Sequence, residues 1–295
     1  MRKTLVVALV VAASALAAGC GGDDDEAAPT TTQAAGAGCT KDSLPTKTPG
    51  KLTIATDNPV FPPWFEGPKK DEPWDPTTTP TKKGYEAEVA YGIARELGFS
   101  DAEVEWTVVP FAQVFRPGPK DFDFDINEAS FSTERAKAVD FSDSYYEVEQ
   151  AVVGVEGTPI ADAKSLAELR KHKLGVAIGT TSYDTIVKVV KPDADPAVYD
   201  TNNDAISGLK AKQIEGIVTD YPTSLYMSAV QVDNGTVVGR LPQVQGNPEH
   251  FGLVFEKGSD LVDCVNDAIA TLRRNGTLDR LEQQWVSGAA PPVLR

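Results

Sequence analysis

Strand patterns alternate with helix patterns along most of this 295-residue chain, and this alternation restricts the fold more than any other feature. A β-rich run over residues 51–56 is followed by a helical pattern over residues 86–97, in which Val89, Ile93 and Leu97 are four residues apart. Strands separated by helices pack as α/β layers, in which the sheets are largely parallel. The sequence therefore predicts an α/β protein.

The pattern continues along the chain and starts afresh near Glu156, so we expect two lobes. Further strands are predicted over residues 104–109, 124–127, 147–155, 174–178, 216–219 and 251–255, and further helices over residues 133–139, 165–171, 182–190, 203–212, 222–230, 261–275 and 278–285. Ligands of open α/β sheets bind at the carboxyl ends of strands. The residues that follow predicted strands are therefore the first candidates for a site.

The N-terminus has the pattern of a bacterial export signal that ends at a lipid-modified cysteine. Arg2 and Lys3 precede an apolar run that is too short to span a bilayer comfortably, and the run ends in residues 16–20, which resemble a lipobox. We expect residues 1–19 to be a lipoprotein signal peptide, and Cys20 to carry acyl chains that hold the protein on the membrane. An ordinary signal peptide with a chance cysteine is the alternative.

Residues 20–49 are predicted to be a flexible tether, because most of this segment is of low complexity and has few apolar side chains to bury. Cys39 and Cys264 are the other two cysteines of the chain. Export would place them in an oxidising space, where two cysteines permit one bridge. We expect this disulfide, which would join the ordered N-terminus to a C-terminal helix; two unpaired thiols are the alternative.

Composition argues against two classes of function. The chain has 43 acidic and 28 basic residues and a net charge of −15, whereas phosphate binding needs a basic face, so we expect no nucleic-acid partner. With two histidines and three cysteines, a Cys/His zinc cluster is nearly excluded, and nothing supports a metal or a redox cofactor. Small ligands are compatible with this composition.

Three polar features at predicted strand ends could together hold a zwitterion. Arg135 lies in the first turn of a predicted helix, where a cation opposes the helix dipole, and arginine can hold a carboxylate with two hydrogen bonds. Asp220 ends a predicted strand and could receive an ammonium group. Thr180 and Thr181 lie in a turn from strand to helix, whose free amide groups can hold an anion.

Two phenylalanines could form apolar walls beside these polar groups. Phe61 lies in a Pro-rich loop and Phe111 follows a predicted strand, so the two rings could enclose a flat or aliphatic part of a ligand. Each feature also has a purely structural explanation. Arg135 could pair with a neighbouring acid on the surface, Asp220 could cap the next helix, and the rings could pack in the core.

At these motifs the chain resembles the family 3 extracellular solute-binding proteins, which serve amino-acid ABC importers. The matching stretches, in order along the chain, are residues 84–90, 130–135, 139–142, 145–146, 175–176, 179–181, 216–220, 255–258, 275–277 and Trp285. Their order and spacing carry the resemblance over roughly residues 50–288.

The resemblance implies a two-lobed type II periplasmic-binding-protein fold with two hinge crossovers, near residues 147–155 and 239–245. Residues 50–150 and 245–295 would form lobe 1, and residues 151–244 would form lobe 2.

The resemblance also implies a role for each polar site residue. Arg135 would hold the ligand α-carboxylate, with help from Thr181 and the loop amides around Thr180. Ser130 would bond near the α-carbon, and Asp220 would take the α-ammonium group.

The side chain of the ligand would lie between Phe61 and Phe111. Glu128 is a departure from the family, because relatives usually carry Gly or Ser there, and a carboxylate in the cleft favours a basic or amide ligand. Glu128 could instead add to ammonium binding, or point away. The aspartate often found in the first ligand loop aligns with Asp57 or with Asn58.

We therefore expect a hinged binding protein rather than an enzyme. A free amino acid, polar or basic, that contacts both lobes would favour their closure, and the closed protein would dock on an ABC-transporter permease. We expect a monomer outside the cytoplasm, anchored to the membrane through Cys20. Two alternatives remain: an enzyme on the same fold, dehydratase-like or glycan-cleaving, with Glu128 as its acid or base, and an extracellular sensor.

Overall fold

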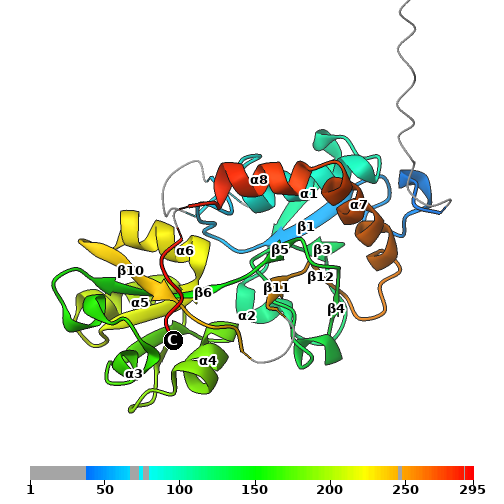
Figure 1. Ribbon diagram of the computed structural model, residues 1–295. Helices are drawn as coiled ribbons and strands as arrows, with labels where there is room; N and C mark the ends of the chain where they lie inside the picture. Colours follow the sequence, from blue (N-terminus) through cyan, green and yellow to red (C-terminus); the bar gives the residue numbers. More distant parts are fainter. Residues whose placement is uncertain (1–37, 67–72, 76–79, 245–247, 289) are drawn as a thin grey trace, which may run out of the picture. The chain divides into compact units, whose positions relative to one another are not determined.

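The computed structural model describes residues 38–66, 73–75, 80–244, 248–288 and 290–295, all within the unit formed by residues 35–295 (Figure 1). The predicted signal peptide (residues 1–19), Cys20 and the first part of the tether lie outside the described residues.

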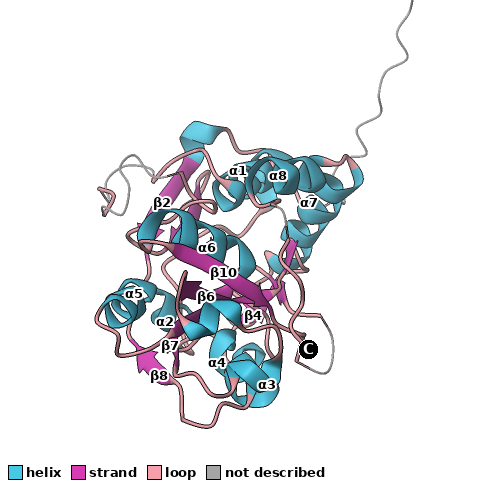
Figure 2. Ribbon diagram, turned by 60° about the vertical axis from the view of Figure 1, so that its left-hand side comes forward, coloured by secondary structure: helices cyan, strands magenta, loops and turns pink. Residues whose placement is uncertain are grey.

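Two five-stranded sheets organise the described chain, and each has helices packed against it (Figures 1 and 2). The first sheet has the order β2-β1-β3-β12-β4, with bounds β1 Leu52–Thr56, β2 Val104–Val108, β3 Phe124–Asp125, β4 Asp140–Phe141 and β12 Val254–Phe255. The second has the order β10-β6-β9-β7-β8, with bounds β6 Gln150–Val155, β7 Leu174–Ala177, β8 Ala197–Tyr199, β9 Gly216–Asp220 and β10 Gly235–Arg240. This α/β architecture is the one predicted from the sequence.

The helices are α1 Tyr85–Glu96, α2 Phe111–Val114, α3 Leu166–Leu169, α4 Thr181–Thr185, α5 Asn202–Lys210, α6 Tyr221–Tyr226, α7 Val262–Arg274 and α8 Thr277–Trp285. Helices α1, α7 and α8 pack together beside the first sheet, whereas α4, α5 and α6 pack on strands of the second (Figure 1). No helix of the described residues is long and apolar enough to cross a bilayer.

Both sheets are mixed, so the expectation of largely parallel sheets is wrong. Each sheet has two parallel and two antiparallel pairings. The antiparallel pairings involve β6 and β12, the strands that follow the two passages of the chain between the sheets. The passages themselves pair through β5 (Tyr146–Glu147) and β11 (His250–Phe251), so the two connections lie side by side.

Two local expectations are also wrong. The helix expected over residues 133–139 is a single 3₁₀ turn, Arg135–Lys137, because the chain enters β4 directly after it. The strand expected over residues 251–255 is divided into β11 and β12, which pair with different strands. The interruption is held by Ser142, whose hydroxyl oxygen accepts a hydrogen bond from the Leu253 amide at 2.8 Å.

The expected disulfide is confirmed. Cys39 and Cys264 are bonded, with their Cα atoms 5.3 Å apart. Cys264 lies in α7 and Cys39 precedes β1, so the bridge fixes the start of the described chain to a helix beside the first sheet. A crosslink between residues 225 positions apart restricts the unfolded chain strongly and therefore stabilises the folded one.

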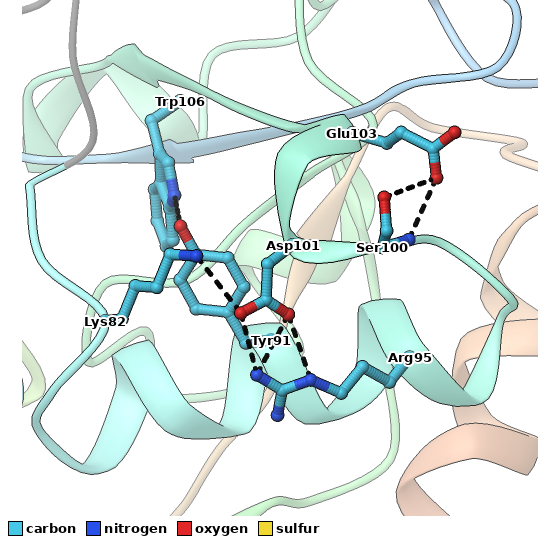
Figure 3. A network of polar contacts seen from close by, with 7 residues as sticks. All are labelled: Lys82, Tyr91, Arg95, Ser100, Asp101, Glu103 and Trp106. Atoms are coloured by element: carbon cyan, nitrogen blue, oxygen red, sulfur yellow. Dashed lines mark hydrogen bonds and ion pairs between the residues drawn. The ribbon is translucent and has the colours of Figure 1, made fainter.

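A polar network joins the C-terminal half of α1 to the connection that leads into β2 (Figure 3). The Arg95 guanidinium donates to both carboxylate oxygens of Asp101, at 2.9 and 3.0 Å, and Lys82 Nζ donates to the same carboxylate at 3.1 Å. Beneath it, Trp106 Nε1 donates to the Tyr91 hydroxyl at 3.1 Å. The two cations are more than half exposed, so this network orients the connection and contributes little to stability.

Helix α1 begins where the loop over residues 61–65 folds against it, and this close approach requires a glycine. The carbonyl oxygen of Trp64 accepts hydrogen bonds from the amides of Glu86 and Ala87, at 3.0 and 3.4 Å. Gly84 has φ +109°, and a Cβ atom there would lie 2.4 Å from the same carbonyl oxygen. The loop therefore seats on α1 only because residue 84 has no side chain.

We expect Gly84→Ala to lower the free energy of unfolding by about 3 kcal/mol, because the Cβ atom collides with backbone that cannot move without loss of the helix start. Gly118→Ala is the matched control: Gly118 has the same φ of +109°, and its added Cβ would meet no atom within 4 Å. The control should cost about 1 kcal/mol. Urea unfolding measures both, and equal losses would show that the contact with Trp64 is unimportant.

Candidate functional site

A cavity of about 230 Å³ lies where loops of the first sheet face loops of the second. All nine residues predicted to bind a ligand line it: Asp57, Phe61, Phe111, Glu128, Ser130, Arg135, Thr180, Thr181 and Asp220. Asn58, the alternative to Asp57, lines it as well. Most of these residues follow the carboxyl ends of β1, β2, β3, β7 and β9, as expected for ligand sites of α/β sheets.

Arg135 connects the two sides of the cavity. Its guanidinium donates to the Ser130 carbonyl oxygen at 2.5 Å on one side and to the Gly179 carbonyl oxygen at 2.7 Å on the other. Its Cζ atom lies 3.9 Å from the centre of the Phe115 ring and 5.5 Å from that of Phe111. Burial lowers the pKa of Arg135 to about 10, so the group is still a cation at neutral pH.

The surface pairing considered for Arg135 is not what the structure shows. Its acidic neighbours have other partners, since Glu134 pairs with Lys137 and Asp140 with Lys257. Asp220 does cap a helix, because its carboxylate accepts from the amide of Thr223 at 2.9 Å, and it also lines the cavity. The structural and the ligand-binding explanations of Asp220 therefore coexist.

Two of the predicted residues use their side-chain oxygen atoms in hydrogen bonds that shape the cavity. The carboxylate of Asp57 accepts from the amides of Asn58 and Phe111, at 2.7 and 3.3 Å, and so joins the loops after β1 and β2. The hydroxyl of Thr180 donates to the carbonyl oxygen of Ala177 at 2.9 Å and closes the turn after β7. These side chains hold the cavity walls in place.

Glu128 has a strained backbone and links the two sides of the cavity. Its φ of +52° is in the left-handed region, which costs a non-glycine residue about 1 kcal/mol or more. Its amide donates to the Glu86 carboxylate at 2.7 Å, and its own carboxylate accepts from the Thr223 hydroxyl at 3.0 Å. Thr223 in turn accepts from Trp64 Nε1 at 2.9 Å.

Three carboxyl groups come close together around this link. Burial, and then the charges of Asp220 and Glu86, raise the pKa of Glu128 well above its usual range. Burial raises the pKa of Glu86 to about 7 and that of Asp220 to about 6. A cation placed among these groups would favour their ionised forms.

Sequence reasoning missed a second group of residues at the cavity. The Glu249 carboxylate accepts from the hydroxyls of Ser130, at 2.6 Å, and of Thr181, and from Gln150 Nε2 at 3.2 Å. Asp200 also lines the cavity, at the end of the short strand β8. Gln150 lies within the crossover predicted near residues 147–155, whereas Glu249 lies beyond the one predicted near residues 239–245, and β8 was not predicted.

Among the described residues, no group of three or more His, Cys, Asp or Glu side chains is arranged to hold a metal ion. The cavity lining instead contains four carboxyl groups, those of Asp57, Glu128, Asp200 and Asp220, and one guanidinium group, that of Arg135. The arrangement suits an organic ligand with one anionic group and more than one cationic group.

Comparison with known proteins agrees with this geometry. The family model of the bacterial extracellular solute-binding proteins, family 3, matches residues 52–288. The chain belongs to this family. Its fold is that of the two-lobed solute-binding proteins; we call the part built on the first sheet lobe 1 and the part built on the second sheet lobe 2.

One relative is the L-cystine-binding protein TcyJ of Escherichia coli. It is 31% identical over 209 residues, and the match covers 68% of this chain and 73% of that protein. The arginine-binding extracellular protein ArtP of Bacillus subtilis is 25% identical over 209 residues, 70% of this chain and 78% of that protein. Among solved structures, an ancestral arginine-binding protein bound to arginine superimposes with a TM-score of 0.64 at 29% identity, covering 80% of this chain and 98% of that one.

The raised pKa of Glu86 makes a prediction about stability and pH. The folded protein keeps this proton up to about pH 7, whereas an unfolded chain loses it near the usual value of 4.5. The resulting stabilisation is complete below pH 4.5 and is lost as the pH rises through about 7, and it amounts to roughly 3 kcal/mol. Glu86→Gln removes the titration, so its stability relative to wild type should rise by up to this amount between pH 4.5 and 8.

Urea unfolding at several pH values measures this difference. Glu96→Gln is the control, because it removes a carboxyl group from the other end of α1, at a partly exposed position. If the difference in the free energy of unfolding between Glu86→Gln and wild type were independent of pH, burial would not raise the pKa of Glu86. The buried carboxyl groups would then not affect how stability depends on pH.

Proposed function

We propose that this protein captures a free cationic amino acid between its two lobes, outside the cytoplasm, and delivers it to the permease of an ABC importer. The observation that carries the proposal is the charge of the cavity lining, which has four carboxyl groups against one guanidinium. An α-amino acid with a cationic side chain supplies one negative and two positive groups. It would therefore match Arg135 and still leave two cations for the acidic residues.

In this proposal each end of the ligand has its own set of partners. Arg135 binds the α-carboxylate, with Ser130 and Thr181 as hydroxyl donors. Asp220 binds the α-ammonium group, and Glu128 binds the cation at the end of the side chain. The surroundings of Glu128 support its role, because the carboxyl groups of Asp220 and Glu86 lie near enough for their charges to act on it.

The remaining predicted residues would form the walls. Phe61 and Phe111 flank the aliphatic part of the ligand, while Asp57 and Thr180 hold the loops that carry them. Ligand contacts with both lobes would favour the state in which the lobes are together, which is the source of affinity in a hinged receptor. The names of relatives support the ligand class, because ArtP and the ancestral protein are described as arginine-binding.

The proposal extends to anchoring and assembly. Residues 1–19 are a signal peptide and Cys20 carries the lipid anchor. The tether begins at Cys20 but ends before the predicted residue 49, because the bridge of Cys39 to Cys264 and the burial of Leu44 fix the later part of that segment to the first sheet and its helices.

Lobe 1 comprises residues 50–150 and 245–288, and lobe 2 comprises residues 151–244. The C-terminal end, predicted for lobe 1, belongs with lobe 2, because Val293 bridges to Arg240 of β10 and Leu294 is buried in the core of the second sheet. The protein acts as a monomer.

We also propose that the protein binds its ligand without chemical turnover. Glu128 is the candidate acid or base of the enzyme alternative. Its carboxylate accepts a hydrogen bond from the Thr223 hydroxyl, and the charges of Asp220 and Glu86 act on it. This environment suits a fixed cation receptor.

Two substitutions test the site by calorimetry with L-arginine, L-lysine and L-glutamine. Arg135→Ala should weaken all three by 100-fold or more, because removal of one partner of a buried charge pair costs about 2–5 kcal/mol. Glu128→Gln should weaken L-arginine and L-lysine by at least about tenfold and L-glutamine much less, since only the first two place a cation there.

Glu134→Gln is the control for both variants. Glu134 is exposed, adjoins Arg135 in sequence and pairs with Lys137, so its loss should leave all affinities unchanged. Full binding after Arg135→Ala would refute the site. An equal loss for all three amino acids after Glu128→Gln would refute the assignment of a cationic ligand.

A further inference from the structure

The carboxylate of Glu249 lies among the groups that a ligand carboxylate would need. It accepts from the Ser130 hydroxyl at 2.6 Å, from the Thr181 hydroxyl, and from Gln150 Nε2 at 3.2 and 3.3 Å. Its own backbone is fixed to the first passage between the lobes, because its carbonyl oxygen accepts from the Val148 amide at 2.9 Å. Glu249 is thus a side chain of the hinge region that contacts three residues of the cavity lining, Ser130, Gln150 and Thr181.

These hydroxyls cannot serve two carboxylates at once. A serine or threonine hydroxyl has one proton to donate. The Ser130 and Thr181 oxygens are only 3.2 Å apart, so both protons are directed to the same small region, which the Glu249 carboxylate occupies. A ligand carboxylate bound to the same donors must displace Glu249.

The charge of Glu249 adds to this competition. It acts on Arg135, the proposed partner of the ligand carboxylate, and on Asp220. Two carboxylates that share two hydroxyls beside one guanidinium repel each other, so the second enters only at the expense of the first. The repulsion disappears for a ligand whose carboxyl group is replaced by a neutral amide.

Glu249 also connects the lobes in the way proposed for the ligand. Ser130 follows β3 in lobe 1, and Thr181 begins α4 in lobe 2, so a single carboxylate bridges them. A bound amino acid would replace this bridge by one of its own. When Glu249 takes the hydroxyls back, the ligand loses two donors, which favours its release.

From these contacts we infer that Glu249 is an internal competitor of the ligand α-carboxylate, a residue that lowers the affinity for amino acids with a free carboxylate and assists their release. This inference rests on the proposed function, in which Ser130, Thr181 and Arg135 bind that carboxylate. Glu249, a residue of the hinge region, would then help to set the affinity for the amino-acid ligand.

The test compares L-arginine with L-argininamide, which differ at the carboxyl group, by calorimetry at pH 7.5 on the full chain. Glu249→Gln keeps the size of the side chain and removes its charge, and Glu249→Ala removes the acceptor. Both should bind L-arginine at least about fivefold more tightly than wild type does. Neither should bind L-argininamide more tightly, because that ligand has no carboxylate to compete.

Glu147→Gln is the matched control. Glu147 is exposed on β5, and its backbone pairs with His250, the residue after Glu249, so this variant removes the same charge from the adjoining strand. It should change the affinity for either ligand by less than twofold. Thermal unfolding verifies that each variant is folded. If Glu249→Gln does not fold, Glu249→Ala provides the test on its own.

Unchanged or weaker binding of L-arginine by both Glu249 variants would overturn the inference while the proposed function stands. Tighter binding of L-arginine and L-argininamide alike would also overturn it, because the gain would then not depend on the carboxylate. If the wild-type protein bound no L-arginine, the proposed function would fail, and the inference with it.

Discussion

The site depends on hydrogen bonds that cross from loops of one sheet to loops of the other. Arg135 makes the clearest of them, because its guanidinium donates to carbonyl oxygens of Ser130 in lobe 1 and Gly179 in lobe 2. Such bonds require each lobe to present its strand ends to the other, which the paired crossovers β5 and β11 allow. The contact of Gly84 with Trp64 seats the loop that carries Phe61, one of the residues of the cavity lining.

The buried carboxyl groups that line the cavity destabilise the folded protein when no ligand is bound. Buried carboxyl groups that raise one another's pKa destabilise a protein unless a cation or a proton joins them. Glu128 adds backbone strain to this cost, although its carboxylate accepts a hydrogen bond from the hydroxyl of Thr223. A cationic ligand offsets these costs, so the same groups that weaken the unliganded fold supply the binding energy.

Strand β10 was not predicted, but the long helices and the strands that carry most of the candidate site residues could be predicted from the sequence, because hydrophobic periodicity is a local signal. That signal placed Asp220 at the end of β9 and Thr181 in the turn that leads into α4. It could not place the three-residue strand β8, and it therefore missed Asp200. Glu249 was missed for another reason: its partners Ser130 and Thr181 are 119 and 68 residues away, and only the folded crossovers bring them together.

A crystal structure of the protein with L-arginine would show whether separate lobes hold the opposite charges of one free amino acid. The α-carboxylate should lie on the Arg135 guanidinium, the α-ammonium group on Asp220 and the ligand guanidinium on Glu128. A ligand bound with all its charged groups on one lobe, or outside the cavity between Arg135 and Asp220, would contradict this arrangement.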